Sequence, residues 1–216
     1  MDYIKFENYT KKIKDKVVLN NINCSFEKGK IYGLYGRNGS GKTMLLRAIA
    51  GLIVPTSGSV TVNGEKIHET IDFPKNTGII IENLSLFPEL TAFQNLKRLA
   101  MIQNKVSDEE IYKAIEMVGL DPKNNEKIKT YSLGMKQKLN IAQAIFENQE
   151  LLLLDEPTNA LDEQSVKDIY NLFMQLKREG KTLIIASHIR EDLESYCDSI
   201  LFIENGNLRE KRWNFY

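Results

Sequence analysis

Short apolar runs alternate with segments of helical periodicity along most of the chain. Four runs have the length of a strand buried on both faces: Ile31–Tyr35, Gly78–Ile81, Glu150–Asp155 and Thr182–Ala186. Between the last two, residues 164–177 place apolar side chains on one face of a predicted helix, which Gly180 closes. Strands that alternate with helices in this way predict an α/β fold with a mostly parallel sheet.

The front of the chain carries a different β pattern. Tyr3–Phe6 and Val17–Phe26 are predicted strands, and a lysine-rich hairpin region separates them. We interpret these lysines as a solvated edge that discourages strand pairing, in preference to a patch for a partner. Residues 60–62 and 66–67 flank Asn63-Gly64, which is typical of a tight hairpin. An antiparallel β element is therefore expected beside the parallel sheet.

The segment from residue 87 to residue 147 has helical character throughout. Its predicted helices are Thr91–Ile102, a helix after the capping box of Ser107 and Glu110, and a helix that runs from Ser132 through Phe146. We expect residues 87–147 to form a helical subdomain. It would be inserted into an α/β core made of residues 1–86 and 148–216.

The strongest chemical signal is the stretch GRNGSGKT, which follows the strand Ile31–Tyr35 and precedes a predicted helix. It fits the phosphate-binding loop pattern, in which glycines let backbone N–H groups curl around an anion at a helix N-terminus. Lys42 can reach the β- and γ-phosphates, and the Thr43 hydroxyl can ligate Mg²⁺. A glycine-rich turn that binds nothing is the alternative, and the order of strand, loop and helix argues against it. The predicted nucleotide-binding residues are Gly36, Arg37, Asn38, Gly39, Ser40, Gly41, Lys42 and Thr43.

Two further strand ends carry groups suited to phosphate chemistry. Asp155 ends the most apolar strand, where its carboxylate can hold Mg²⁺ directly or through water. Glu156 points elsewhere, because neighbouring strand residues alternate, and can orient or deprotonate the attacking water. At the end of the next strand, His188 is better explained by a γ-phosphate contact than by packing. A chance acidic strand end is the alternative reading of this pair of carboxylates.

Composition narrows the class of protein. The 216 residues include 29 basic and 29 acidic side chains, so nothing in the bulk charge suggests nucleic acid or an anionic membrane surface. Cys24 and Cys197 form no disulfide framework, which fits a reducing, cytoplasmic setting. The first residues lack an apolar signal core, and no apolar run approaches the length needed to span a bilayer. If the protein acts at a membrane, another chain must supply the spanning part.

Together with the segment from Ser132 to Gln137, these motifs make the chain resemble the ATP-binding subunit of an ABC transporter over nearly its whole length. GRNGSGKT resembles the Walker A loop and LLLLDE the Walker B strand, while residues 159–162 resemble the D-loop and His188 the switch histidine. YSLGM at residues 131–135 stands where the family usually has LSGGQ, and Glu82 stands where it has the Q-loop glutamine. The chain looks most like bacterial export subunits of the peptide-antibiotic and drug-resistance type.

The resemblance implies a P-loop NTPase (RecA-like) fold and a head-to-tail dimer around two ATP molecules. Ser132 and the backbone near Gly134 of one subunit would contact the γ-phosphate held by the other. The implied catalytic residues are Glu156 and His188, and the implied Mg²⁺ ligands are Thr43, Asp155 and Glu82. A membrane-spanning subunit would convert dimer closure into substrate movement, with export expected. The protein would lie on the inner face of the cell membrane through this partner. Its dimer partner would be a second copy or a related ATPase subunit, and the presence of both Glu156 and Ser132 favours a self-paired dimer.

Three positions depart from the family pattern. Leu133 and Met135 replace a glycine and a glutamine, so we expect altered packing at the dimer interface. At the Q-loop position, Glu82 adds a charge that would attract Mg²⁺ and repel the γ-phosphate, and the net sign stays open. By spacing, Ile13 stands where an aromatic residue usually stacks on adenine. Loss of such a contact predicts poor discrimination between ATP and GTP.

Other functions remain as alternatives at this stage. A soluble ABC ATPase that drives DNA or ribosome mechanics shares the ATPase motifs, although this chain has no sustained heptads and a single Walker A loop. A small-molecule kinase or GTPase would need a lid or a guanine-reading motif that we do not find. The apolar residues Leu84, Leu86, Phe87 and Leu90 could receive a coupling helix from a membrane subunit, or could pack within the hinge.

Overall fold

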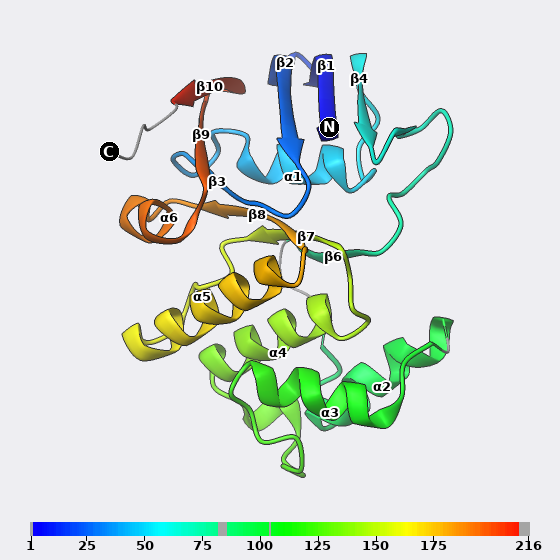
Figure 1. Ribbon diagram of the computed structural model, residues 1–216, viewed down its shortest axis with the longest axis vertical. Helices are drawn as coiled ribbons and strands as arrows, with labels where there is room; N and C mark the ends of the chain where they lie inside the picture. The colour runs from blue at the N-terminus through cyan, green and yellow to red at the C-terminus, as the bar shows by residue number, and fades with distance from the viewer. Residues whose placement is uncertain (1, 82–85, 104, 212–216) are drawn as a thin grey trace.

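The computed structural model describes residues 2–81, 86–103 and 105–211, which form layers of sheet and helix (Figure 1). The strands are β1 (Asp2–Ile13), β2 (Lys16–Glu27), β3 (Ile31–Tyr35), β4 (Ser57–Val62), β5 (Glu65–Lys66), β6 (Thr77–Ile80), β7 (Leu151–Asp155), β8 (Thr182–Ser187), β9 (Ser199–Glu204) and β10 (Asn207–Lys211). The helices are α1 (Lys42–Ile49), α2 (Ala92–Gln103), α3 (Asp108–Met117), the 3₁₀ turn η1 (Ile128–Thr130), α4 (Leu133–Ile145), α5 (Glu163–Arg178) and α6 (Arg190–Tyr196).

The central sheet has the order β10-β9-β3-β8-β7-β6. Its strands pair in parallel from β9 to β6, and only β10 runs antiparallel. The strand β7 shows why an apolar run is needed here, because its alternate side chains enter different cores. Leu151 and Leu153 pack in the core on the α1 side, while Leu152 and Leu154 pack in the core on the other side. The predicted α/β fold is confirmed.

A second sheet, of order β2-β1-β4-β5, is antiparallel throughout. It lies on one side of the central sheet, with α1 between the two sheets (Figure 1). The strand β1 runs further than the predicted Tyr3–Phe6, since it continues to Ile13 with register shifts along the way. The second half of β1 is mostly polar, so its sequence does not predict a strand. It is a strand because its backbone groups pair with those of β2.

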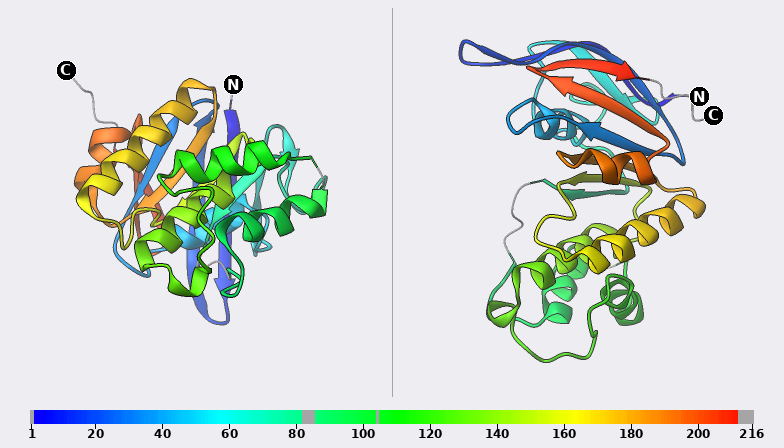
Figure 2. Two further views of the ribbon diagram at one scale, coloured as in Figure 1. Left: turned by 90° about the horizontal axis from the view of Figure 1, so that it is seen from below. Right: turned by 90° about the vertical axis from the view of Figure 1, so that its left-hand side faces the viewer.

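The remaining helices cover the opposite face of the central sheet, and α2 and α3 lie furthest from the antiparallel sheet (Figures 1 and 2). In α3, the predicted capping box forms between Ser107 and Glu110. At α4, Ser132 is the N-cap, as predicted, and its hydroxyl accepts from the backbone N–H of Met135 at 3.1 Å. Within the described ranges, no helix is both long enough and apolar enough to cross a bilayer. The boundaries expected for the helical subdomain stay a prediction.

Candidate nucleotide site

Three parallel strands of the central sheet end beside one another at the candidate site. Gly36 follows β3, Asp155 ends β7, and His188 follows β8, which pairs with both. Because parallel strands bring their carboxyl ends to one edge of the sheet, groups distant in sequence meet here. A cavity of about 420 Å³ opens at this edge. It is lined by Lys16, Val17, Val18, Arg37, Asn38, Gly39, Gly41, Lys42, Thr43, Met44, Asp155, Glu156, Asn205 and Gly206.

The phosphate-loop residues lie against the turn between β9 and β10. A Cβ atom on Gly36 would come within 2.4 Å of the Ile203 carbonyl oxygen and 2.6 Å of Ser40 Oγ, so only glycine fits at this position. The backbone N–H of Gly206 donates to the Ser40 carbonyl at 2.9 Å. Gly41, with φ of 117°, precedes the first turn of α1 and points the helix N-terminus at the cavity. The strand β9 and the turn that follows it therefore support the side of the loop that faces away from the cavity.

Lys42 is a buried cation within this loop. Its Nζ atom donates to the Gly36 carbonyl at 2.7 Å and lies 3.4 Å from Glu156 Oε1. The side chain of Lys42 is 6% exposed and that of Glu156 is 18% exposed. A buried ammonium needs anionic or strongly polar partners, and the Gly36 carbonyl and the Glu156 carboxylate supply them.

Thr43 and Asp155 form the second polar pair of the site. The Thr43 hydroxyl donates to Asp155 Oδ2 at 2.5 Å, from α1 to the end of β7. Burial raises the pKa of Asp155, and the Thr43 hydrogen bond opposes this rise only in part. A hydroxyl oxygen next to a carboxylate with poor access to water is a donor set of the kind that Mg²⁺ takes. The third predicted ligand, Glu82, lies outside the described residues.

Glu156 and His188 contact each other through their side chains. Glu156 Oε2 is 2.9 Å from His188 Nδ1, and the histidine side chain is 48% exposed. The backbone of Glu156 has φ of 48°, in the left-handed region that costs a residue with a side chain about 1–3 kcal/mol. Its N–H donates to the Ala186 carbonyl at 2.8 Å, which fixes this turn to β8. The strain bends the chain so that the carboxylate faces Lys42 and His188.

The signature residues lie elsewhere on the chain. Ser132 and Gly134 stand at the start of α4 and are not among the residues that line the cavity. Ser132 is exposed, and the side chain of Leu133 is 73% exposed. This subunit alone therefore does not bring the two predicted halves of an ATP site together.

The structure does not bring Ile13, the position expected beside adenine, to the lining of the cavity. Ile13 is 45% exposed and is not among the lining residues, whereas Lys16, Val17 and Val18 are. The turn residues Asn205 and Gly206, between β9 and β10, also line the cavity. No sequence signal of nucleotide binding marks Asn205 and Gly206, because they reach the site through the pairing of β9 with β3.

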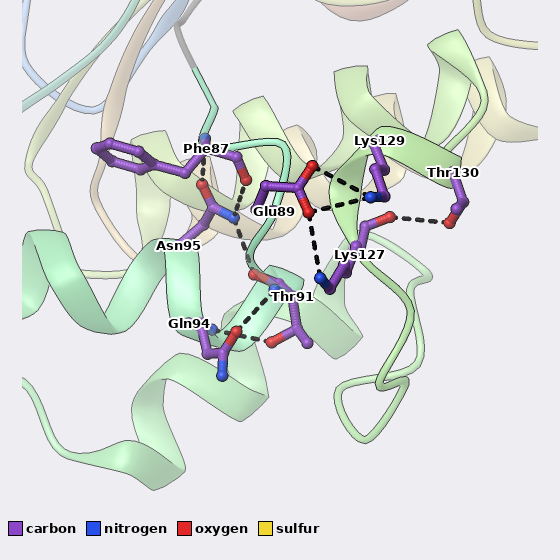
Figure 3. A network of polar contacts seen from close by, with 8 residues as sticks. All are labelled: Phe87, Glu89, Thr91, Gln94, Asn95, Lys127, Lys129 and Thr130. Atoms are coloured by element: carbon purple, nitrogen blue, oxygen red, sulfur yellow. Dashed lines mark hydrogen bonds and ion pairs between the residues drawn. The ribbon is translucent and has the colours of Figure 1, made fainter.

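A polar network ties the segment after residue 86 to the segment before Ser132 (Figure 3). The buried side chain of Asn95 accepts from the backbone N–H of Phe87 at 2.8 Å and donates to the carbonyls of Phe87 and Thr91. Glu89 pairs with Lys127 and Lys129. Backbone bonds from residues 128 and 129 to the carbonyls of residues 90 and 88 complete the link. The two segments therefore form one unit that leads into the signature.

Comparison with known proteins identifies the family. The family model described as ABC transporter matches residues 19–159. The chain is 55% identical to the uncharacterized ABC transporter ATP-binding protein YybJ of Bacillus subtilis (strain 168), across 95% of this chain and 94% of that protein. It is 41% identical to the bacitracin transport ATP-binding protein BcrA of Enterococcus faecalis, across 98% of this chain and 70% of that protein.

Solved structures agree with the sequence comparison. The dimeric structure of MJ0796, a bacterial ABC transporter cassette, superposes with a TM-score of 0.88 at 26% identity, over 99% of this chain and all of that one. A post-hydrolysis structure of the same cassette, bound to ADP and Pi, gives a TM-score of 0.87, also at 26% identity and over the same shares of the two chains. On the family model, the sequence identities and these superpositions, the chain belongs to the ABC transporter family, as an ATP-binding subunit that hydrolyses ATP.

Proposed function

We propose that two copies of this chain bind two ATP molecules in a head-to-tail dimer and power a membrane-spanning partner. The observation that carries the proposal is the meeting of Lys42, Thr43, Asp155 and Glu156 at one edge of the sheet, away from Ser132. A site that is complete except for its signature needs a second subunit. The dimer described for MJ0796 supports this arrangement.

In this arrangement, Lys42 and the backbone of residues 36–43 hold the β- and γ-phosphates, and the signature of the other subunit contacts the γ-phosphate. Glu156 accepts a proton from the attacking water, and His188 holds the carboxylate and contacts the γ-phosphate. Thr43 and Asp155 are the proposed ligands of Mg²⁺, which when bound neutralises charge on the phosphate oxygens. The residues 87–147 are proposed as the subdomain that carries the signature.

Export is the proposed direction of transport. The relatives support it, because BcrA is named for bacitracin transport and SrtF of Streptococcus pyogenes is named for lantibiotic transport. The SrtF sequence is 37% identical across 95% of this chain and 88% of that protein. We place the protein on the cytoplasmic face of the membrane, bound to its spanning partner.

The test is purification of the tagged protein from membranes in mild detergent, with identification of the proteins that accompany it. A multi-spanning membrane protein in stoichiometric amount, with ATPase activity that Glu156→Gln reduces to a low residual rate, is the expected result. Recovery only from the soluble fraction with ribosomal or DNA-repair proteins would replace the transport proposal with the alternative of a soluble mechanical ATPase. A preparation without ATPase activity would contradict the roles given to the site residues.

A further inference from the structure

We infer that Gln137 is a positioning residue that holds the catalytic turn at Glu156 in register with the signature helix of the same subunit. The inference rests on the proposed function, since it assigns a role within that site. Gln137 lies on α4, 19 residues before Glu156 along the chain. Its part in the site arises from the folded structure.

The contact is made by the side-chain amide of Gln137. The Nε2 atom donates to the Pro157 carbonyl at 2.9 Å and lies 3.4 Å from the Glu156 carbonyl oxygen. These are the first two carbonyl groups of the turn that leaves β7. On the other side of the amide, Asn140 Nδ2 lies 3.5 Å from Gln137 Oε1. Asn140, also on α4, thus orients the Gln137 amide, and the amide binds one side of the turn.

The turn that Gln137 grips is strained. Glu156 has φ of 48°, so its backbone leaves the region that residues with side chains prefer. Such a conformation persists only where its surroundings hold it in place. The Ala186 carbonyl holds the N–H side of Glu156, and Gln137 contacts the carbonyl side. Loss of one of the two would let the carboxylate leave its position beside Lys42 and His188.

The helix α4 has two faces with different tasks. Gly134 and Gln137 are three residues apart, so they share one face, which lies against the loop of residues 156–161. A Cβ atom on Gly134 would come within 3.0 Å of the Ala160 carbonyl oxygen, which shows how closely this face packs. Leu133 points to solvent, where the other subunit would bind. When α4 moves on contact with the ATP bound to the other subunit, Gln137 would transmit that movement to Glu156. Glu156 acts on the ATP bound to its own subunit.

The experiment replaces the amide without changing its size. Gln137→Met removes the donor, and Gln143→Met makes the same change further along α4, beside Gly78 and Ile79 at β6. We expect Gln137→Met to lower kcat about tenfold and to leave KM for ATP within about twofold, since the turn moves and the phosphate loop does not. The variant Gln143→Met should keep the wild-type kcat. Gln137→Glu, which keeps the shape of the side chain and loses the donor, should reproduce the loss in kcat.

A double-mutant cycle separates positioning from a structural role. If Gln137 acts through Glu156, then Gln137→Met should lower the residual hydrolysis of a Glu156→Gln protein by less than about twofold. An equal tenfold loss in both backgrounds, or equal kcat values for Gln137→Met, Gln143→Met and the wild type, would overturn the inference alone. An inactive wild-type protein would overturn the proposed function and the inference together. The comparison thus tells the two failures apart.

Discussion

Replacement of Glu156 by Gln should destabilise the nucleotide-free protein and at the same time tighten its binding of ATP. Lys42 Nζ lies 3.4 Å from Glu156 Oε1, and both side chains are largely removed from water. At this distance and an effective dielectric constant near 20, the attraction is about 5 kcal/mol. Removal of the carboxylate also relieves the cost of burying it, which is several kcal/mol. Lys42 keeps the Gly36 carbonyl, so we expect a net loss of about 2 kcal/mol.

The loss should disappear when ATP is bound. The phosphates then replace Glu156 as the anionic partner of Lys42, so the bound states of the two proteins differ little at this contact. By the thermodynamic cycle, 2 kcal/mol corresponds to about thirtyfold tighter binding by the variant. For a chain of this length, the same energy lowers Tm of the nucleotide-free variant by about 4–8 °C.

The assay is thermal unfolding with and without a nonhydrolysable ATP analogue, together with titration of the analogue at dilute protein concentration. Glu163→Gln is the matched control, because Glu163 pairs with Lys167 on the surface and its side chain is 87% exposed. Solvent screens that pair, so the control should melt and bind as the wild type does. Equal Tm and equal affinity for Glu156→Gln and the wild type would refute the reasoning. The Lys42–Glu156 contact would then contribute nothing to either state.

Three further predictions concern stability, base preference and coupling. Burial raises the pKa of Glu147, so the wild type loses stability as pH rises from about 4.3, the unfolded value, through the folded pKa. Denaturant unfolding at pH 4 and pH 7 should therefore show Glu147→Gln gaining stability relative to the wild type at the higher pH, and a constant difference would contradict this. Among the described residues that line the cavity there is no aromatic side chain to stack on a base, so kcat/KM for GTP should lie within about tenfold of that for ATP, and a larger ATP preference would argue against it. Asn95 accepts a hydrogen bond from the backbone N–H of Phe87, and Phe87 is 46% exposed. Phe87→Asp should therefore abolish transport in vesicles while basal ATPase persists, whereas a loss of folding would favour packing within the hinge.

Much of the fold and the site could be predicted from local pattern. The strand Ile31–Tyr35 and the cap at Ser107 stand where the sequence placed them, since a buried run and a capping box are decided by neighbouring residues. The second half of β1 could not be predicted in this way. Residues 7–13 (ENYTKKI) are mostly polar and show no regular apolar alternation, and the strand forms because β2 and β4 supply backbone partners.

The sequence by itself determined the chemistry of this protein. The phosphate loop, the acidic strand end and the signature helix are short motifs. The residues of each motif are neighbours in the chain, so the sequence shows the motif without knowledge of the fold. The tertiary structure alone decided how these pieces meet. It brought Asn205 to the nucleotide cavity, Glu156 to Lys42, and Gln137 to the turn at Pro157. The physical reason is that parallel strands and packed helices join residues far apart in sequence, and no local pattern records which backbone carbonyl a distant side chain will find.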